Sequence, residues 1–157
     1  MQDDGFLTAG SLRFGNWYFL QYGKTEGPVD VVKALRRSKD IFFYVLGAKM
    51  GPISMRTWGE RFGLGVAVPF AFNQAEGILP SPFWKTEMLK ENWYLGDTYN
   101  YAIGQGYTLV TPIQMAYALS PFANGGYQCE PQLLKNAKPI CHKVLIVTGK
   151  QIGRAHV

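Results

Sequence analysis

The sequence predicts one mainly helical domain that also contains short strands. Its 157 residues are enough for one ordinary domain with a core of its own. Hydrophobic residues make up 47% and charged residues 17%, a composition that favours a packed core over disorder. Several stretches carry helix-start and helix-stop signals, whereas 18 glycines and 9 prolines are too many for a plain helical bundle.

The first part of the chain predicts strands, turns and then a helix. Residues 5–22 are rich in aromatic side chains and punctuated by glycines, a pattern typical of short strands and turns. Pro28 suits the first position of a helix, and Asp30 would lie in its first turn. The apolar face of this helix would comprise Val31, Ala34 and Leu35. Ser38 continues that face, which predicts a hydroxyl at its inner edge where the helix ends.

A second helix is expected over residues 41–50. Asp40 is a suitable N-cap, and Gly51-Pro52 should end the helix. Because residues 41–50 are apolar on nearly every side, we expect this helix to be buried. The longest apolar run, residues 41–48, is far shorter than the ~20 residues that cross a bilayer. The acidic start of the chain also differs from the basic start of a signal peptide.

A third helix is expected to begin at Ser54 as N-cap and to end at Gly63. Arg56 and Glu60 are spaced to form an i,i+4 ion pair on its surface. Residues 65–91 contain three prolines and no helical period, so they predict a loop with a short helix from Trp84.

The clearest helix start in the chain follows Thr111. Pro112 would take the first helical position, and Gln114 would complete a capping box with Thr111. The run Asn124-Gly125-Gly126 should end this helix. Pro121 lies inside it and should kink or shorten it, because proline has no N–H to donate.

The charges and cysteines restrict the classes of ligand. The formal net charge is +5, but the basic residues do not cluster, which argues against a nucleic-acid partner. Cys129, Cys141 and His142 are too few ligands for a structural zinc site. A disulfide between the two cysteines and a pair of buried free thiols remain equally open.

Four stretches follow one another in an order and at a spacing that match a known family. They are residues 23–44, residues 58–65 (Trp58-Gly59-Glu60-Arg61-Phe62-Gly63-Leu64-Gly65), residues 93–100 (Trp93-Tyr94-Leu95-Gly96-Asp97-Thr98-Tyr99-Asn100) and residues 102–126. Together they resemble class B penicillin-binding proteins, the D,D-transpeptidases that cross-link peptidoglycan. The resemblance covers roughly residues 14–142.

The resemblance implies which residues carry the chemistry. In this family three motifs converge: Ser-x-x-Lys, Ser-x-Asn or Ser-x-Asp, and Lys-Thr-Gly. The sequence Ser38-Lys39-Asp40 matches the middle one, so Ser38 and Asp40 are the expected catalytic residues. The middle motif passes a proton to the leaving amine and keeps the surroundings of the catalytic lysine polar. Lys39, at the variable position, is expected to be a solvated surface charge.

The other two motifs do not occur in the 157 residues. None of the five serines has a lysine three positions later, and there is no Lys-Thr-Gly. The nucleophile would therefore lie outside this sequence, and we expect the chain alone to be inactive. The implied fold is α+β, the mainly helical portion of the β-lactamase-like transpeptidase fold with its central strands largely missing. Missing strands should leave some apolar surface uncovered.

The resemblance also implies domains, ligands and location. Residues 1–146 would be part of a transpeptidase domain, and residues 147–157 an unstructured tail, because residues 152–157 look like a translated sequencing adapter. The parent enzyme would bind peptidoglycan stem peptides and β-lactams, and would work with cell-wall synthesis proteins at the extracytoplasmic face of the cytoplasmic membrane. No metal, organic cofactor or nucleic acid is implied.

The alternative is a non-catalytic module that binds peptidoglycan or carbohydrate through exposed aromatics. For the transpeptidase we expect Ser38 and Asp40 at a helix–helix junction, with Ser38 facing a concavity.

Overall fold

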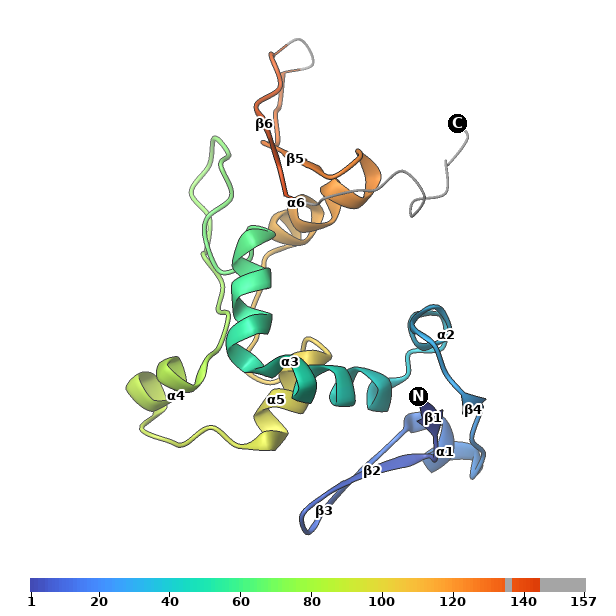
Figure 1. Ribbon diagram of the computed structural model, residues 1–157. Helices are drawn as coiled ribbons and strands as arrows, with labels where there is room; N and C mark the ends of the chain where they lie inside the picture. The colour runs from blue at the N-terminus through green and yellow to red at the C-terminus, as the bar shows by residue number, and fades with distance from the viewer. Residues whose placement is uncertain (135–136, 145–157) are drawn as a thin grey trace. The chain divides into compact units, whose positions relative to one another are not determined.

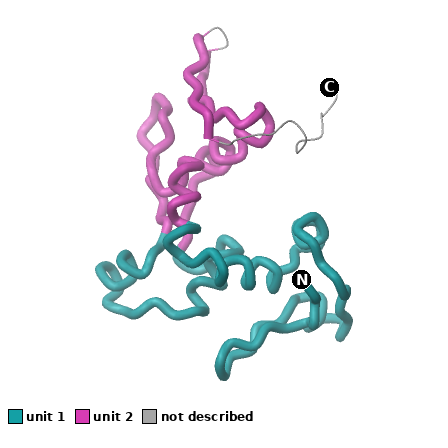
Figure 2. Tube along the Cα trace, viewed as in Figure 1, with its two compact units in different colours: residues 1–55, 80–107 teal, residues 56–79, 108–157 magenta. Residues whose placement is uncertain are grey.

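The computed structural model describes residues 1–134 and 137–144 (Figure 1). The described residues form two compact units: Met1–Met55 with Pro80–Tyr107, and Arg56–Leu79 with the described residues between Thr108 and Val144 (Figure 2). Within the described residues, six helices accompany six short strands, which pair in three two-stranded antiparallel sheets. The expectation of a mainly helical chain with short strands is confirmed. The tail expected at residues 147–157 lies outside the described residues.

Unit 1 begins with two strand pairs. β1 (Gln2–Asp3) pairs with β4 (Gly27–Pro28), and Asp3 lies opposite Gly27. β2 (Phe6–Ala9) and β3 (Leu12–Gly15) form a hairpin in which Phe6 lies opposite Gly15. The strands expected in residues 5–22 are therefore present.

A helix follows where the aromatic pattern predicted only strands and turns. α1 (Trp17–Tyr22) begins at Asn16, whose side-chain oxygen accepts a hydrogen bond from the Tyr18 N–H at 3.0 Å. Gly23 ends it in the left-handed conformation, with φ of 64°. The cap residues on either side of the aromatic run are ordinary helix signals, and they outweigh the strand preference of its side chains.

α2 (Val31–Arg36) starts later than the sequence predicts. Asp30 is its N-cap, not a first-turn residue, because its carboxylate accepts the Lys33 N–H at 2.7 Å. Pro28 belongs to β4 and not to the helix. The predicted apolar face is also only partly buried, since Ala34 is buried while Val31 and Leu35 are exposed. An apolar surface thus remains uncovered here.

α3 (Asp40–Arg61) contains a break where the sequence placed one. Gly51 has non-helical angles (φ 76°, ψ 158°), and the helix resumes at Pro52. The predicted N-cap at Ser54 is wrong, because Ser54 lies inside the resumed helix. The first half is not buried on every side either: Ile41, Tyr44 and Gly47 are buried, whereas Leu46 and Met50 are exposed.

α5 (Leu95–Ala102) packs against the first half of α3 and forms the core of unit 1 (Figure 1). The rings of Tyr44 and Tyr99 stack with centroids 5.2 Å apart, and Phe14 of the hairpin meets Tyr99 edge-on at 4.9 Å. Gly47 allows the two helices to approach closely, because a Cβ at this position would collide with the Cβ of Ala102. No helix was expected over residues 95–102 from the sequence.

α4 (Pro82–Leu89) completes the helices of unit 1. Its N-cap is Ser81, whose hydroxyl accepts the Trp84 N–H at 3.1 Å, so the helix starts two positions before the predicted Trp84. Lys85 on this helix is buried and pairs with Asp97 at 2.8 Å.

Unit 2 follows the local signals of the sequence closely. Gly63 ends α3 as predicted, with φ of 78° and a hydrogen bond from the Leu64 N–H to the Gly59 carbonyl at 3.0 Å. Arg56 and Glu60 form the expected ion pair at 2.7 Å.

α6 (Pro112–Ala123) has the predicted capping box. Thr111 accepts the Gln114 N–H at 3.2 Å, and Gln114 accepts the Thr111 N–H at 2.8 Å. The Gln114 amide also donates to the carbonyls of Val66 and Glu76, at 2.6 and 2.8 Å, and so fixes a loop far away in sequence. Pro121 does not shorten the helix, which continues to Ala123.

The last strand pair contains the two cysteines. β5 (Tyr127–Cys129) pairs with β6 (Cys141–Lys143), and Cys129 and Cys141 lie opposite each other and form a disulfide. Of the two possibilities that the sequence left open, the structure has the disulfide. In the part of the chain that is described, no group of three or more potential ligands is placed to hold a metal ion. None of the described helices is long and apolar enough to cross a membrane.

Candidate active site

Ser38 occupies an unusual backbone position between α2 and α3. The Lys39 N–H donates to the Ala34 carbonyl at 2.9 Å, and the Ser38 N–H donates to the Leu35 carbonyl at 3.3 Å. These are the two hydrogen bonds of a Schellman motif, in which Ser38 is the left-handed residue, with φ of 48°. Glycine usually takes this position, because a Cβ costs about 1–2 kcal/mol there. Since glycine would adopt this conformation without strain, a serine at this position indicates that its hydroxyl has a function.

A cavity opens beside this turn. Its volume is about 290 Å³. It is lined by Leu35, Ser38, Asp40, Phe43, Ala102 and Ile103. The lining combines the end of α2, the first turn of α3 and the end of α5, all within unit 1. The structure thus brings Ser38 and Asp40 together at a helix–helix junction and on one concavity, as predicted from the sequence.

The reason for this placement differs from the one given by the sequence. Ser38 does not continue a helical face, because α2 ends at Arg36. It reaches the cavity through the turn that follows the helix.

Asp40 is half-buried at the start of α3. Burial raises the pKa of its carboxyl above the ordinary value, although the positive charge of Lys39 acts in the opposite direction. The cavity is therefore lined by a serine and by an aspartate whose carboxyl pKa is raised, next to apolar side chains. Groups of these types can exchange a proton with a bound ligand or orient it by hydrogen bonds.

Lys39 is not the solvated surface charge that the sequence predicted. Its side chain is only 2% exposed. The ammonium lies 3.1 Å from a carboxylate oxygen of Asp3 and 3.6 Å from one of Glu26. It also lies 4.9 Å from the centre of the Tyr18 ring. A lysine can be buried in this way because the two carboxylates compensate its charge.

Further hydrogen bonds hold the two carboxylates. The Asn16 amide donates to both Asp3 oxygens, at 3.2 and 3.1 Å, and the Gly5 N–H donates to one of them at 3.0 Å. Burial alone would raise the pKa of Asp3, but these donors and Lys39 together lower it. The pKa of Glu26 is lowered mainly by its hydrogen bond from Arg37, at 2.8 Å. Sequence reasoning missed this cluster, since no local spacing connects its members.

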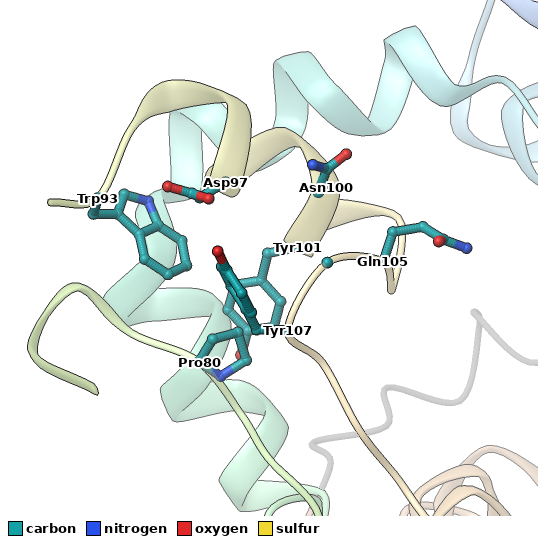
Figure 3. A pocket seen from close by; sticks show the side chains of 8 residues that line it. Pro80, Trp93, Asp97, Asn100, Tyr101, Gln105 and Tyr107 are labelled. Atoms are coloured by element: carbon teal, nitrogen blue, oxygen red, sulfur yellow. The ribbon is translucent and has the colours of Figure 1, made fainter. Parts of the chain in front are cut away.

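A second cavity of about 280 Å³ lies in the same unit. Figure 3 shows its aromatic side chains, including Trp93, with the Asn100 and Gln105 side chains apart from the rings. Its carboxylate, Asp97, already accepts hydrogen bonds from Lys85 and from the Tyr94 N–H, at 2.8 and 2.7 Å. The Trp93 N–H likewise donates to a threonine hydroxyl at 2.8 Å. Asp97 and Trp93 are therefore already engaged within the chain, and no observation at this cavity specifically indicates a carbohydrate-binding module.

Comparison with known proteins shows which family the chain belongs to. The penicillin binding protein transpeptidase domain family matches residues 1–154. The chain belongs to this family. Peptidoglycan D,D-transpeptidase MrdA of Salmonella typhimurium is 40% identical over 121 residues, which are 76% of this chain and 19% of that protein. The MrdA of Acinetobacter baumannii is 36% identical over 149 residues, covering 88% of this chain and 21% of the relative.

Solved penicillin-binding proteins have the same fold. The structure of Pseudomonas aeruginosa PBP2 in complex with WCK 5153 is similar with a TM-score of 0.72 and 34% identity, over 80% of this chain and 27% of that one. Helicobacter pylori PBP2, in its complex with MreC, has a TM-score of 0.77 and 28% identity, over 93% of this chain and 27% of that one. The chain therefore spans about a fifth of the length of the curated transpeptidases it matches. It has the α+β fold of part of a penicillin-binding transpeptidase domain.

Proposed function

We propose that this chain supplies the middle active-site motif of a peptidoglycan D,D-transpeptidase, with Ser38 and Asp40 as catalytic residues. The observation that carries the proposal is the backbone of Ser38, a strained left-handed serine on the wall of a cavity that it shares with Asp40. Membership of the transpeptidase family and the activity named for the MrdA relatives support the same role.

The reaction would be acyl transfer through a serine of a Ser-x-x-Lys motif outside these 157 residues. The oxygen of that serine forms an ester with a stem-peptide carbonyl carbon, and the peptide C–N bond breaks. The proton that the nucleophile loses passes by way of its lysine and the Ser38 hydroxyl to the leaving amine. Asp40 keeps the surroundings of that lysine polar. The amine of a second stem peptide then forms a C–N bond with the ester carbonyl carbon, the C–O bond to the serine breaks, and the proton that the amine loses returns to the serine oxygen.

The same role gives the ligands and partners we propose. A β-lactam would acylate the same nucleophile, and the Pseudomonas aeruginosa relative is in complex with a compound, WCK 5153. A cell-wall synthesis protein is a suitable partner, since the Helicobacter pylori relative is in complex with MreC. We place the enzyme at the extracytoplasmic face of the cytoplasmic membrane, where the Cys129–Cys141 disulfide would be stable.

The test uses a chimera, because the nucleophile is not in this sequence. Residues 1–144 of this chain replace the matching stretch of the Acinetobacter baumannii MrdA relative. We expect a fluorescent penicillin to label the chimera and not the isolated 157-residue chain. Ser38→Ala and Asp40→Ala should lower the labelling rate by on the order of 10²–10⁴-fold, the range typical of positioned proton-transfer groups.

The control is Ser54→Ala, a serine on the exposed surface of α3. It should label at the parent rate. If Ser38→Ala and Ser54→Ala chimeras label equally fast, Ser38 has no catalytic role. If the isolated chain forms a stoichiometric adduct, the nucleophile lies within these 157 residues and the proposal is wrong.

A further inference from the structure

Lys39 stands between the two proposed catalytic residues, and its side chain takes no part in lining their cavity. It lies instead in the buried cluster with Asp3 and Glu26. A buried ammonium held by two carboxylates has little freedom to move, since leaving either partner would leave a charge uncompensated. The Lys39 side chain therefore holds the Cα of Lys39, between Ser38 and Asp40, in a fixed position.

The backbone on both sides of Lys39 is fixed as well. Its N–H donates to the Ala34 carbonyl at 2.9 Å, and its carbonyl accepts the Phe42 N–H at 3.1 Å. The indole N–H of Trp17 donates to the Ser38 carbonyl at 3.2 Å. These contacts join the end of α2, the start of α3 and α1 around one peptide segment.

The anchor for Lys39 is built by the N-terminal part of the chain. Asp3 lies in β1 opposite Gly27 of β4, which places Glu26 beside it, and the Glu26 N–H donates to an Asp3 oxygen at 3.3 Å. The Asn16 side chain, which also caps α1, donates to both Asp3 oxygens. The strand pair and the helix cap thus place two carboxylates at one point.

From this arrangement we infer that Lys39 is a positioning residue. Held by Asp3 and Glu26, it keeps the strained turn in the conformation that presents the Ser38 hydroxyl and the Asp40 carboxyl to the cavity. The inference rests on the proposed function of Ser38 and Asp40. Lys39 acts through its two neighbours, Ser38 and Asp40, and does not contact the substrate.

The experiment measures two quantities on the chimera described above. One is the rate constant for labelling by fluorescent penicillin, and the other is the final amount of label per mole of protein. A purely structural defect reduces the final amount, because fewer molecules are folded, and leaves the rate constant of the folded ones unchanged. A positioning defect reduces the rate constant while the final amount stays near the parent value.

We expect Lys39→Met, which keeps a long side chain and removes the charge, to lower the rate constant by on the order of 10²-fold, the effect typical of a misplaced catalytic group. Asp3→Asn should lower it by a smaller factor, since Glu26 still holds the ammonium. Lys49→Met is the matched control, an exposed lysine on the same helix, and should leave both quantities unchanged.

Two results would overturn the inference. One is an equal rate constant for Lys39→Met and Lys49→Met; the other is a lower final amount with an unchanged rate constant. If Lys39→Met does not fold in the chimera, Asp3→Asn decides by the same criteria. Ser38→Ala is measured alongside: if it keeps the parent rate, the proposed function fails, and if it loses the rate while Lys39→Met keeps it, only the positioning role fails.

Discussion

Replacing Ser38 with glycine should separate the chemical role of the serine from its effect on the fold. Ser38 is the left-handed residue of the Schellman motif that ends α2, with φ of 48°. Glycine adopts this conformation without a steric penalty. Ser38→Gly therefore relieves the strain and removes the hydroxyl in a single change.

The size of the effect follows from two opposing contributions. Relief of the left-handed strain is worth about 1–2 kcal/mol. Glycine gains more freedom in the unfolded chain, which costs about 0.4–1 kcal/mol. The free energy of unfolding should therefore rise by about 0.5–1 kcal/mol. Ser38→Ala keeps the strain and loses only the hydroxyl, so its stability should stay close to that of the parent.

The assay combines urea unfolding with penicillin labelling of the chimera. We expect Ser38→Gly to unfold at a higher urea concentration than Ser38→Ala, while both variants lose labelling to a similar extent. The reasoning would be refuted if Ser38→Gly were less stable than Ser38→Ala, because the backbone of Ser38 would then not be strained. Retained labelling by Ser38→Gly would equally refute a catalytic hydroxyl.

Three further predictions concern packing, the disulfide and pH. Gly47→Ala should destabilise the chimera by about 1–3 kcal/mol, because the new methyl group collides with Ala102. Gly96→Ala on α5, where a Cβ would have room, should leave the stability unchanged. Urea unfolding of the two variants compares their stabilities directly. Alkylation followed by mass spectrometry should modify no cysteine of the unreduced 157-residue chain and both after reduction. The folded protein lowers the pKa of Asp3, so the ionised carboxylate stabilises the fold above the unfolded pKa of 3.8, and this stabilisation is lost as pH falls through the folded pKa. Acid should therefore destabilise the Asp3→Asn chimera less than the parent chimera. An equal loss of stability in the two proteins would contradict this prediction.

The features that the sequence predicted well depend on a few neighbouring residues. The capping box of Thr111 and Gln114, the helix break at Gly51 and the Schellman ending at Gly63 each arise within one turn of backbone. Side-chain oxygens satisfy free N–H groups at helix starts, and glycine accepts positive φ at helix ends. Such signals are therefore readable without knowledge of the rest of the fold.

The features that the sequence did not predict depend on contacts between distant segments. Lysine usually lies on the protein surface, yet Lys39 is buried between the carboxylates of Asp3 and Glu26. The exposure of Leu46 on an apolar helix likewise depends on which segments pack against α3. No local sequence pattern indicates the burial of Lys39 or the exposure of Leu46, because the tertiary structure determines which side chains are buried.

The candidate site was predicted in part. The motif around Ser38 and Asp40 was identified by resemblance, and both residues line one cavity. Their geometry was not predictable, because the sequence suggested a helix that begins near Pro28 and carries Ser38 on its face. Asp30 instead caps a shorter helix, and the turn after Arg36 gives Ser38 its orientation.

The most direct test of the central claim is a crystal structure of the chimera acylated by a penicillin. The distance to measure joins the Ser38 Oγ to the nearer of two nitrogens, that of the opened β-lactam and that of the Ser-x-x-Lys lysine. The proposed proton path predicts a hydrogen bond, with a separation of about 2.6–3.2 Å. A Ser38 hydroxyl that points into solvent, with both nitrogens beyond reach of a hydrogen bond or one bridging water, would contradict the account.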